Sequence, residues 1–291
     1  MQSGDGDSAI WAVCHYLVFG FQAGRALEQL QHDTLVYIKQ GDELNRGQTV
    51  VCMVLLRQAC LNLMGMSQNP IELTGESIDQ NEVTNVALMT MNRSLLCWIL
   101  ALQSLLYAFF GEHELGAELA LSKGDTQEKV LVGSSLIAHD VFYRGISLFE
   151  MARKTKNRRY KKEAKKTRSC VKSWLAKGNP NMKHIDAALL AESAALDGKD
   201  QQARRHYEKA VVAAARAGFV HHAALISERY GDYLFQELSC PDDASFQFEN
   251  ATKFYSSWGA FAKVDILRQK KRTCRLLEQP KGRFRRGLGS G

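Results

Sequence analysis

The strongest constraint on the fold is a trio of residues, small, aromatic and small, that recurs after 41 positions. The trio consists of Ala203, Tyr207 and Ala210 in its first copy and of Ala244, Phe248 and Ala251 in its second. Steps of four and three residues place each trio on one face of a helix. Small residues let two helix backbones approach closely, and the ring between them packs against the next helix. The recurrence therefore predicts successive pairs of helices that nest against each other.

Turn residues divide this region into helices. A short turn precedes a helix at 201–217, and Gly218 ends it because glycine accepts the left-handed geometry beyond a helix C-terminus. A second helix is expected at 219–235, with Gly231 at a close contact to the facing helix. The pattern is similar to that of tetratricopeptide repeats, although its period exceeds their usual ~34 residues. An ordinary helical bundle with coincidental spacing is the alternative. A weaker echo of the trio lies 39 residues upstream, at Ala164, Arg168 and Val171.

The run from Tyr255 to Val264 reads Tyr-Ser-Ser-Trp-Gly-Ala-Phe-Ala-Lys-Val, in which Trp258 closes a helix and Gly259 lets the chain turn. This run resembles a signature, Tyr-x-x-Trp-Gly-Ala-x-x-Lys-Val, of one family of large sensor proteins. Those proteins join a serine/threonine kinase, an AAA-type ATPase module, a long tetratricopeptide-like region and often a histidine kinase or cyclase. The resemblance covers residues 195–270 and implies a regulatory docking role in signal transduction. No kinase or ATPase residue carries over, because those modules lie outside the matched region.

The composition favours one α-helical domain. Only four of the 291 residues are proline, hydrophobic residues make up 45%, and β-branched residues do not alternate with polar ones. A chain of this length is long for one compact core but ordinary for one helical solenoid. We therefore predict a single helical-repeat domain at 9–278, a disordered N-terminus at 1–8 and a disordered basic tail at 279–291.

Two observations bear on localisation. The seven cysteines are scattered and form no Cys-x-x-Cys pair, which indicates a reducing compartment rather than a disulfide framework or a zinc site. The segment Leu95–Phe110 is apolar at fourteen of sixteen positions. A bilayer span needs ~20 such residues, so a buried central helix is the better interpretation. We expect a cytoplasmic protein without a transmembrane segment.

Several further helices are predicted upstream of the repeats. Ser77 and Gln80 have the spacing of a capping box for a helix that starts near 80. Asp125 and Glu128 are expected to cap one long helix at 126–154. Shorter helices are expected at 9–21, 25–44, 47–64 and 114–122, with an irregular segment at 65–79.

A strongly basic segment, 153–172, contains eleven Lys or Arg and one acid, so it carries +10 and the rest of the chain −3. Helical spacing gathers the lysines opposite an inward stripe that includes Ala164 and Val171. The candidate partner-binding residues on this face are Lys161, Lys162, Lys165, Lys166 and Lys172. The face can bind an acidic protein segment, anionic lipid or nucleic-acid phosphates, or it can be a solvated face that keeps the array soluble. Without aromatic residues or arginine forks it cannot read bases, which makes nucleic acid the weakest candidate.

No motif for catalysis stands out. The chain lacks a phosphate-binding Gly-x-x-x-x-Gly-Lys-Ser/Thr loop and a Gly-x-Gly-x-x-Gly sequence. His221 and His222 are adjacent and point about 100° apart on a helix, which favours solvated or core histidines over a shared metal ion. We therefore predict a protein that is not an enzyme and uses no metal or other cofactor.

The sequence thus predicts a non-catalytic array of about ten helices, stacked as antiparallel pairs, whose concave side docks a peptide segment or a neighbouring signalling domain. The alternative is a binder of nucleic acid or anionic surfaces through 153–172.

Overall fold

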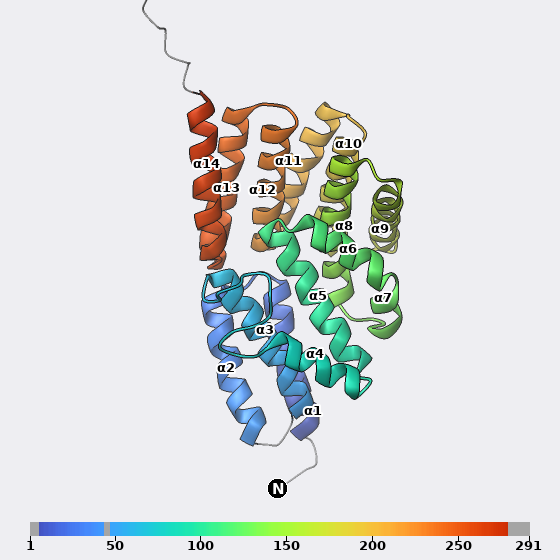
Figure 1. Ribbon diagram of the computed structural model, residues 1–291, viewed down its shortest axis with the longest axis vertical. Coiled ribbons are helices and arrows are strands. Elements are labelled where there is room, and N and C mark those ends of the chain that lie inside the picture. The colour runs from blue at the N-terminus through green and yellow to red at the C-terminus, as the bar shows by residue number, and fades with distance from the viewer. Residues whose placement is uncertain (1–5, 44–46, 279–291) are drawn as a thin grey trace, which may run out of the picture.

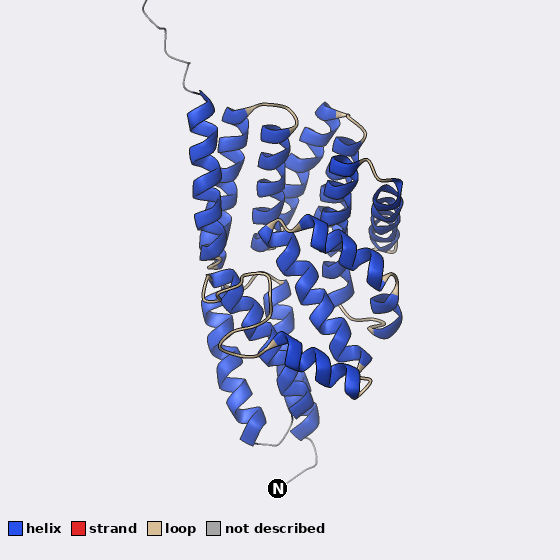
Figure 2. Cartoon of the chain, in the orientation of Figure 1, coloured by secondary structure: helices blue, strands red, loops and turns tan. Residues whose placement is uncertain are grey.

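The computed structural model describes residues 6–43 and 47–278. Within these ranges the chain is helical and contains no strand (Figure 1, Figure 2). The prediction of an all-α fold is confirmed, with fourteen α-helices where about ten were expected. The first helix begins at Gly6, three residues before its predicted start. Residues 1–5 and the predicted tail at 279–291 lie outside the described residues.

The elements follow one another through short connections, apart from one long irregular segment at 65–79. In chain order they are α1 (Gly6–Gln22), α2 (Leu27–Glu43), α3 (Gly47–Met64), α4 (Gln80–Met89), α5 (Arg93–Phe110), α6 (His113–Lys123), α7 (Thr126–Val130), α8 (Leu136–Thr155), α9 (Arg158–Ala176), the 3-10 helix η1 (Pro180–Met182), α10 (Lys183–Leu196), α11 (Asp200–Arg216), α12 (Val220–Gln236), α13 (Pro241–Trp258) and α14 (Phe261–Glu278).

The C-terminal half consists of three helical hairpins, α8–α9, α10–α11 and α12–α13, followed by α14 (Figure 1). The two helices of each hairpin differ in burial. α8, α10 and α12 are buried around most of their circumference, whereas α9, α11 and α13 bury one face and expose the other. The first helices of the hairpins therefore form an inner layer, and the second helices form an outer layer.

The recurring trio occupies the buried face of the outer layer. Ala164, Ala203 and Ala244 have no exposed surface, and the same holds for the last members of the trio, Val171, Ala210 and Ala251. The rings of Tyr207 and Phe248 are each 1% exposed. Gly231 lies against one of these rings, because a β-carbon on Gly231 would come within 2.5 Å of Phe248 Cε1. The predicted close approach between α12 and α13 is thus present.

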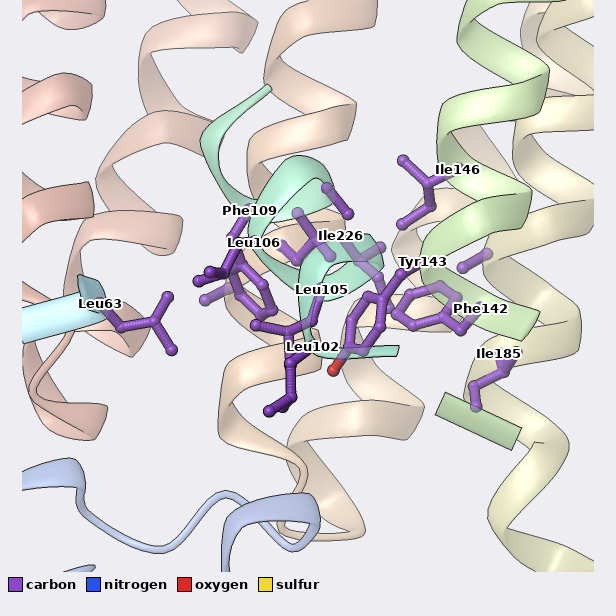
Figure 3. Packing of buried hydrophobic residues seen from close by; sticks show 14 of the residues in the cluster. Leu63, Leu102, Leu105, Leu106, Phe109, Phe142, Tyr143, Ile146, Ile185 and Ile226 are labelled. Carbon is purple, nitrogen blue, oxygen red and sulfur yellow. The ribbon is translucent and has the colours of Figure 1, made fainter. Parts of the chain in front are cut away.

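The apolar helix α5 packs against the inner layer. Its Phe109 ring lies 5.7 Å from Tyr143 on α8, and 6.1 Å and 5.4 Å from Tyr255 and Trp258 on α13. Leucines of α5 meet Ile226 of α12 in the same core (Figure 3). Among the described residues α5 alone is long and apolar enough to cross a membrane, and half of it is buried inside the protein. This packing supports the interpretation of α5 as a core helix.

The N-terminal helices pack against the start of α12 and the turn between α13 and α14. A β-carbon on Gly24 would lie 3.2 Å from the Val220 amide nitrogen at the start of α12. Gly259, between α13 and α14, lies against Leu27 of α2 and adopts a φ of +91°, which L side chains rarely adopt. The sequence correctly places the end of a helix at Trp258 and a turn at Gly259.

Two local predictions are wrong. Ser77 and Gln80 do not form a capping box: Asp79 caps α4 by accepting from the amides of Asn81 and Glu82. Ser77 Oγ instead accepts a hydrogen bond from Arg57.

The predicted helix at 126–154 is also interrupted. It consists of α7 and α8, separated by a turn in which Gly133 has a φ of +80°. Periodicity did not reveal this break, because the residues on both sides of it continue one apolar stripe.

Candidate functional site

The basic face lies on α9, in the outer layer. Its inward stripe is buried as predicted, and Lys162, Lys165 and Lys172 are exposed on the opposite side. Two of the five predicted lysines are engaged within the protein. Lys161 Nζ bonds Asp197 Oδ1 at 3.2 Å, and Lys166 Nζ bonds Asp125 Oδ1 at 2.6 Å. Acidic residues of neighbouring elements thus neutralise part of the face.

Asp125 stands at the N-cap position of α7, but its side chain makes no capping hydrogen bond, so the predicted cap is wrong; the carboxylate pairs with Lys166 instead. The hydrogen bond from Lys166 lowers the pKa of the Asp125 carboxyl and raises the pKa of the Lys166 ammonium. Both side chains are about half exposed, so the pair adds little stability. Within the described residues, no acidic side chain pairs with Lys162, Lys165 or Lys172, and these three remain available to an anionic partner.

Arg153, counted above among the basic residues, belongs instead to a buried ionic cluster between the inner helices. Arg229 of α12 donates to Glu150 of α8 at 2.5 Å and to Glu192 of α10 at 3.0 Å, and Arg153 donates to Glu192 at 3.1 Å. Burial alone would raise the pKa of Glu150, but the guanidinium groups of Arg229 and Arg153 hold it well below its ordinary value. The cluster joins α8, α10 and α12 through paired charges.

A second buried ionic cluster joins α12 to α13 and α14. Glu228 accepts from Tyr255 Oη at 2.8 Å and from Lys263 Nζ and Lys270 Nζ, each at 3.0 Å. Lys270 also bonds Asp232. Burial favours the neutral form of Glu228, but the two ammonium groups outweigh it and lower the pKa of Glu228 to about 2. The two lysines thus keep a buried carboxylate ionised.

Helix α1 exposes a row of aromatic side chains that the sequence argument did not single out. Trp11, Tyr16 and Phe19 keep 45%, 53% and 52% of their surface exposed, while Ile10, Cys14, Leu17, Val18 and Phe21 on the other face are buried. The His15 ring lies 5.9 Å from both Trp11 and Phe19, which makes the row continuous. A helix that is apolar on both faces normally has both covered. The exposed positions were available in the sequence as Trp11, His15 and Phe19, spaced four apart.

Four histidines meet where the first turns of the inner helices converge. His139 lies in the first turn of α8, His184 in that of α10, and His221 and His222 in that of α12. His222 Nδ1 lies 2.8 Å from His184 Nε2, and His222 Nε2 lies 3.4 Å from His139 Nδ1. Burial lowers the pKa of His139 to about 4 and that of His184 to about 3, so these rings are neutral near pH 7. His221 and His222 are core residues, one of the two alternatives predicted for them.

No family model, curated protein or solved structure matches this chain.

Proposed function

We propose that this chain is a non-catalytic, tetratricopeptide-like helical-repeat scaffold that docks a protein partner in cytoplasmic signal transduction. Two observations support the repeat assignment. The small residues of the trio are fully buried at matching positions of α9, α11 and α13. Three consecutive hairpins stack with the same division into inner and outer helices. The signalling role rests on the resemblance of residues 195–270 to the helical region of sensor proteins.

The docking surface we propose differs from the concave side expected from the sequence. That side corresponds to the inner helices, and α5 and α6 already pack against them: Phe109 contacts Tyr143, and a β-carbon on Gly116 would meet Ser147 Oγ at 2.5 Å. A partner therefore needs a surface that the chain itself leaves uncovered. The aromatic row of α1 is such a surface.

The exposed side chains of Trp11, Tyr16 and Phe19 carry the proposal. Tryptophan and tyrosine are enriched among the residues that dominate binding energy at protein interfaces. Their positions on one helix suit a partner helix that lays its own apolar face along α1. We propose an amphipathic helix as the docked segment.

The test compares two double variants as bait with the unmodified chain. Trp11→Ala/Phe19→Ala removes the row, and Val212→Ala/Phe246→Ala removes two exposed apolar side chains of the outer layer. A partner recovered by the unmodified chain is then purified, and its binding to all three proteins is measured by calorimetry. We expect saturable binding that weakens at least ~10-fold in the row variant, since interface hot spots cost more than 1 kcal/mol each. Equal binding by all three folded proteins would reject α1 as the docking surface.

The unpaired lysines of α9 support a second candidate, a binder of anionic surfaces. Electrostatic binding of this kind falls steeply with salt. The test replaces Lys162, Lys165 and Lys172 by Glu and compares the variant with one that makes the same charge change elsewhere, at Lys199, Lys209 and Lys253. Binding to duplex DNA and to vesicles with 30% anionic lipid, about the proportion that gives a strong surface potential, should be lost in the first variant only. Binding whose affinity does not change with salt concentration, or that both variants weaken equally, would exclude this candidate.

A further inference from the structure

The four-histidine cluster brings ring nitrogens of three side chains close together inside the protein, and Tyr143 Oη lies 3.1 Å from one of them, His222 Nε2. One ring nitrogen from each of His139, His221 and His222 lies within 4.8 Å of the other two. His221 and His222 have no exposed surface, and His139 is partly buried. The three rings come from two helices whose positions are fixed by the inner layer. Neutral imidazole is also the form of histidine that binds metal ions.

One pair of these nitrogens already has the separation found across a metal ion. A tetrahedral zinc ion holds two nitrogens at about 2.0–2.1 Å each, which places them about 3.3 Å from each other. His139 Nδ1 and His222 Nε2 are 3.4 Å apart. Because the three nitrogens lie within 4.8 Å of one another, some point among them lies no more than about 2.8 Å from each, and side-chain rotations that bring His221 closer would give bonding distances.

His221 supplies independent evidence. Both of its ring nitrogens are buried and have no hydrogen-bond partner. A buried polar atom without a partner is rare in a native protein and calls for an explanation such as a missing ion. The ring is confined, since it lies 5.2 Å from the Trp258 ring and a β-carbon on Gly24 would approach its Nδ1 to 2.8 Å.

We infer that His139, His221 and His222 form a binding site for one divalent transition-metal ion of the zinc type. Three imidazoles without carboxylate or thiolate select zinc, cobalt, nickel or copper over calcium and magnesium, which prefer oxygen ligands. Adjacent histidines on a helix point about 100° apart, which argued against a shared metal ion. That angle describes only the Cα–Cβ directions, and the ring nitrogens of His221 and His222 nevertheless lie close together. The third ligand comes from α8, 82 residues before His221.

Neighbouring groups complete the coordination environment. When His222 Nε2 binds the metal, His222 must carry its proton on Nδ1, and His184 Nε2, 2.8 Å away, accepts the hydrogen bond from this N–H group. A cavity of about 290 Å³, lined by His139, His184 and Phe219 among others, gives solvent ions a path to the His139 side of the site. The site lies at helix N-termini, whose dipoles disfavour a cation, so we expect a Kd on the order of micromolar rather than picomolar.

The experiment uses the untagged full chain, stripped with a chelator and titrated with Co²⁺ and then with Zn²⁺. We expect one Co²⁺ per chain with the absorption bands of a tetrahedral site, displaced by one equivalent of Zn²⁺. His139→Ala should weaken binding more than ~100-fold, and His184→Asn should weaken it ~10–100-fold, the usual effect of losing an outer-shell partner. His15→Ala and His32→Ala, at exposed histidines, should bind as the unmodified chain does.

His139 is the first position to test because it is only partly buried, and its variant is checked for folding by circular dichroism before titration. Should it fail to fold, His139→Gln keeps the volume and removes the ligand. A folded, unmodified chain that binds no Co²⁺ or Zn²⁺ at ~100 µM, a concentration far above the expected Kd, would overturn the inference. Binding of equal affinity in a folded His139 variant would also overturn it.

Discussion

Gly231 offers the sharpest test of how the hairpins pack. A β-carbon at this position would lie 2.5 Å from Phe248 Cε1 and 2.7 Å from Cδ1, closer than unbonded carbon atoms approach. The Phe248 ring is 1% exposed and cannot rotate into solvent. Gly231→Leu should therefore separate α12 from α13 and destabilise the protein by about 1–3 kcal/mol, the usual cost of overpacking.

Gly231→Ala tests the same contact with the smallest possible change. Replacing a helical glycine by alanine stabilises a helix by about 1 kcal/mol, which works against the clash. The net destabilisation is therefore expected to be about 1 kcal/mol. The matched control is Gly20→Ala in α1, where the new β-carbon would meet only ordinary contacts at 3.5 Å. That variant should be neutral or up to about 1 kcal/mol more stable.

A double-mutant cycle separates the clash from other effects. Phe248→Leu alone removes buried volume and should cost about 1–3 kcal/mol. In Gly231→Ala/Phe248→Leu the alanine has room, so the two changes together should cost about 1–2 kcal/mol less than their sum. Urea unfolding followed by circular dichroism measures all four free energies. Additivity within 0.5 kcal/mol, the usual scatter for independent sites, would refute the close contact.

Three further perturbations test other parts of the core. Arg229→Met leaves Glu192 buried with Arg153 as its remaining cationic partner and Glu150 with Arg153 and the half-exposed Lys154, and should cost about 3–5 kcal/mol in urea unfolding. A loss below about 1 kcal/mol would show that the carboxylates are solvated. Phe109→Ala should cost about 3–5 kcal/mol because the ring is fully buried against three other rings. An unchanged stability would show that α5 does not pack in the core as described. The pKa of Glu228 in the folded protein is about 2, below its ordinary value of 4.5. Its ionised form therefore contributes about 3 kcal/mol to the free energy of unfolding above pH 4.5, and this contribution is lost as the pH falls toward 2. Glu228→Gln should flatten the dependence of unfolding free energy on pH in that window, and an unchanged slope would contradict the assigned pKa.

The sequence predicted the C-terminal helices well because local signals and packing agree there. The helices predicted at 201–217 and 219–235 differ from α11 and α12 by about one residue at each end. Gly218 follows α11, and the apolar stripe matches the face that the hairpin buries. The break between α7 and α8 was missed, because the apolar stripe continues on both sides of the turn at Gly133.

The candidate sites were harder to predict, since they depend on residues distant in the sequence. Helical spacing shows that Lys161 and Lys166 lie on the exposed side of α9, but their partners Asp197 and Asp125 lie 36 and 41 residues away. The histidine cluster joins residues from three helices for the same reason. A single sequence contains no signal that pairs His139 with His222.

The residues that carry the resemblance to sensor proteins belong to one packing junction. Tyr255 and Lys263 both bond Glu228, Trp258 lies 5.9 Å from Phe21 of α1, and Gly259 makes the turn against α2. Each of these positions is therefore required by the contact between α12, α13 and α14 and the N-terminal helices. A resemblance based on such residues concerns how the helices pack and does not identify a partner. If the proposed docking role is right, partner choice depends on positions that packing leaves free, and the aromatic row of α1 and the unpaired lysines of α9 are two such surfaces among the described residues.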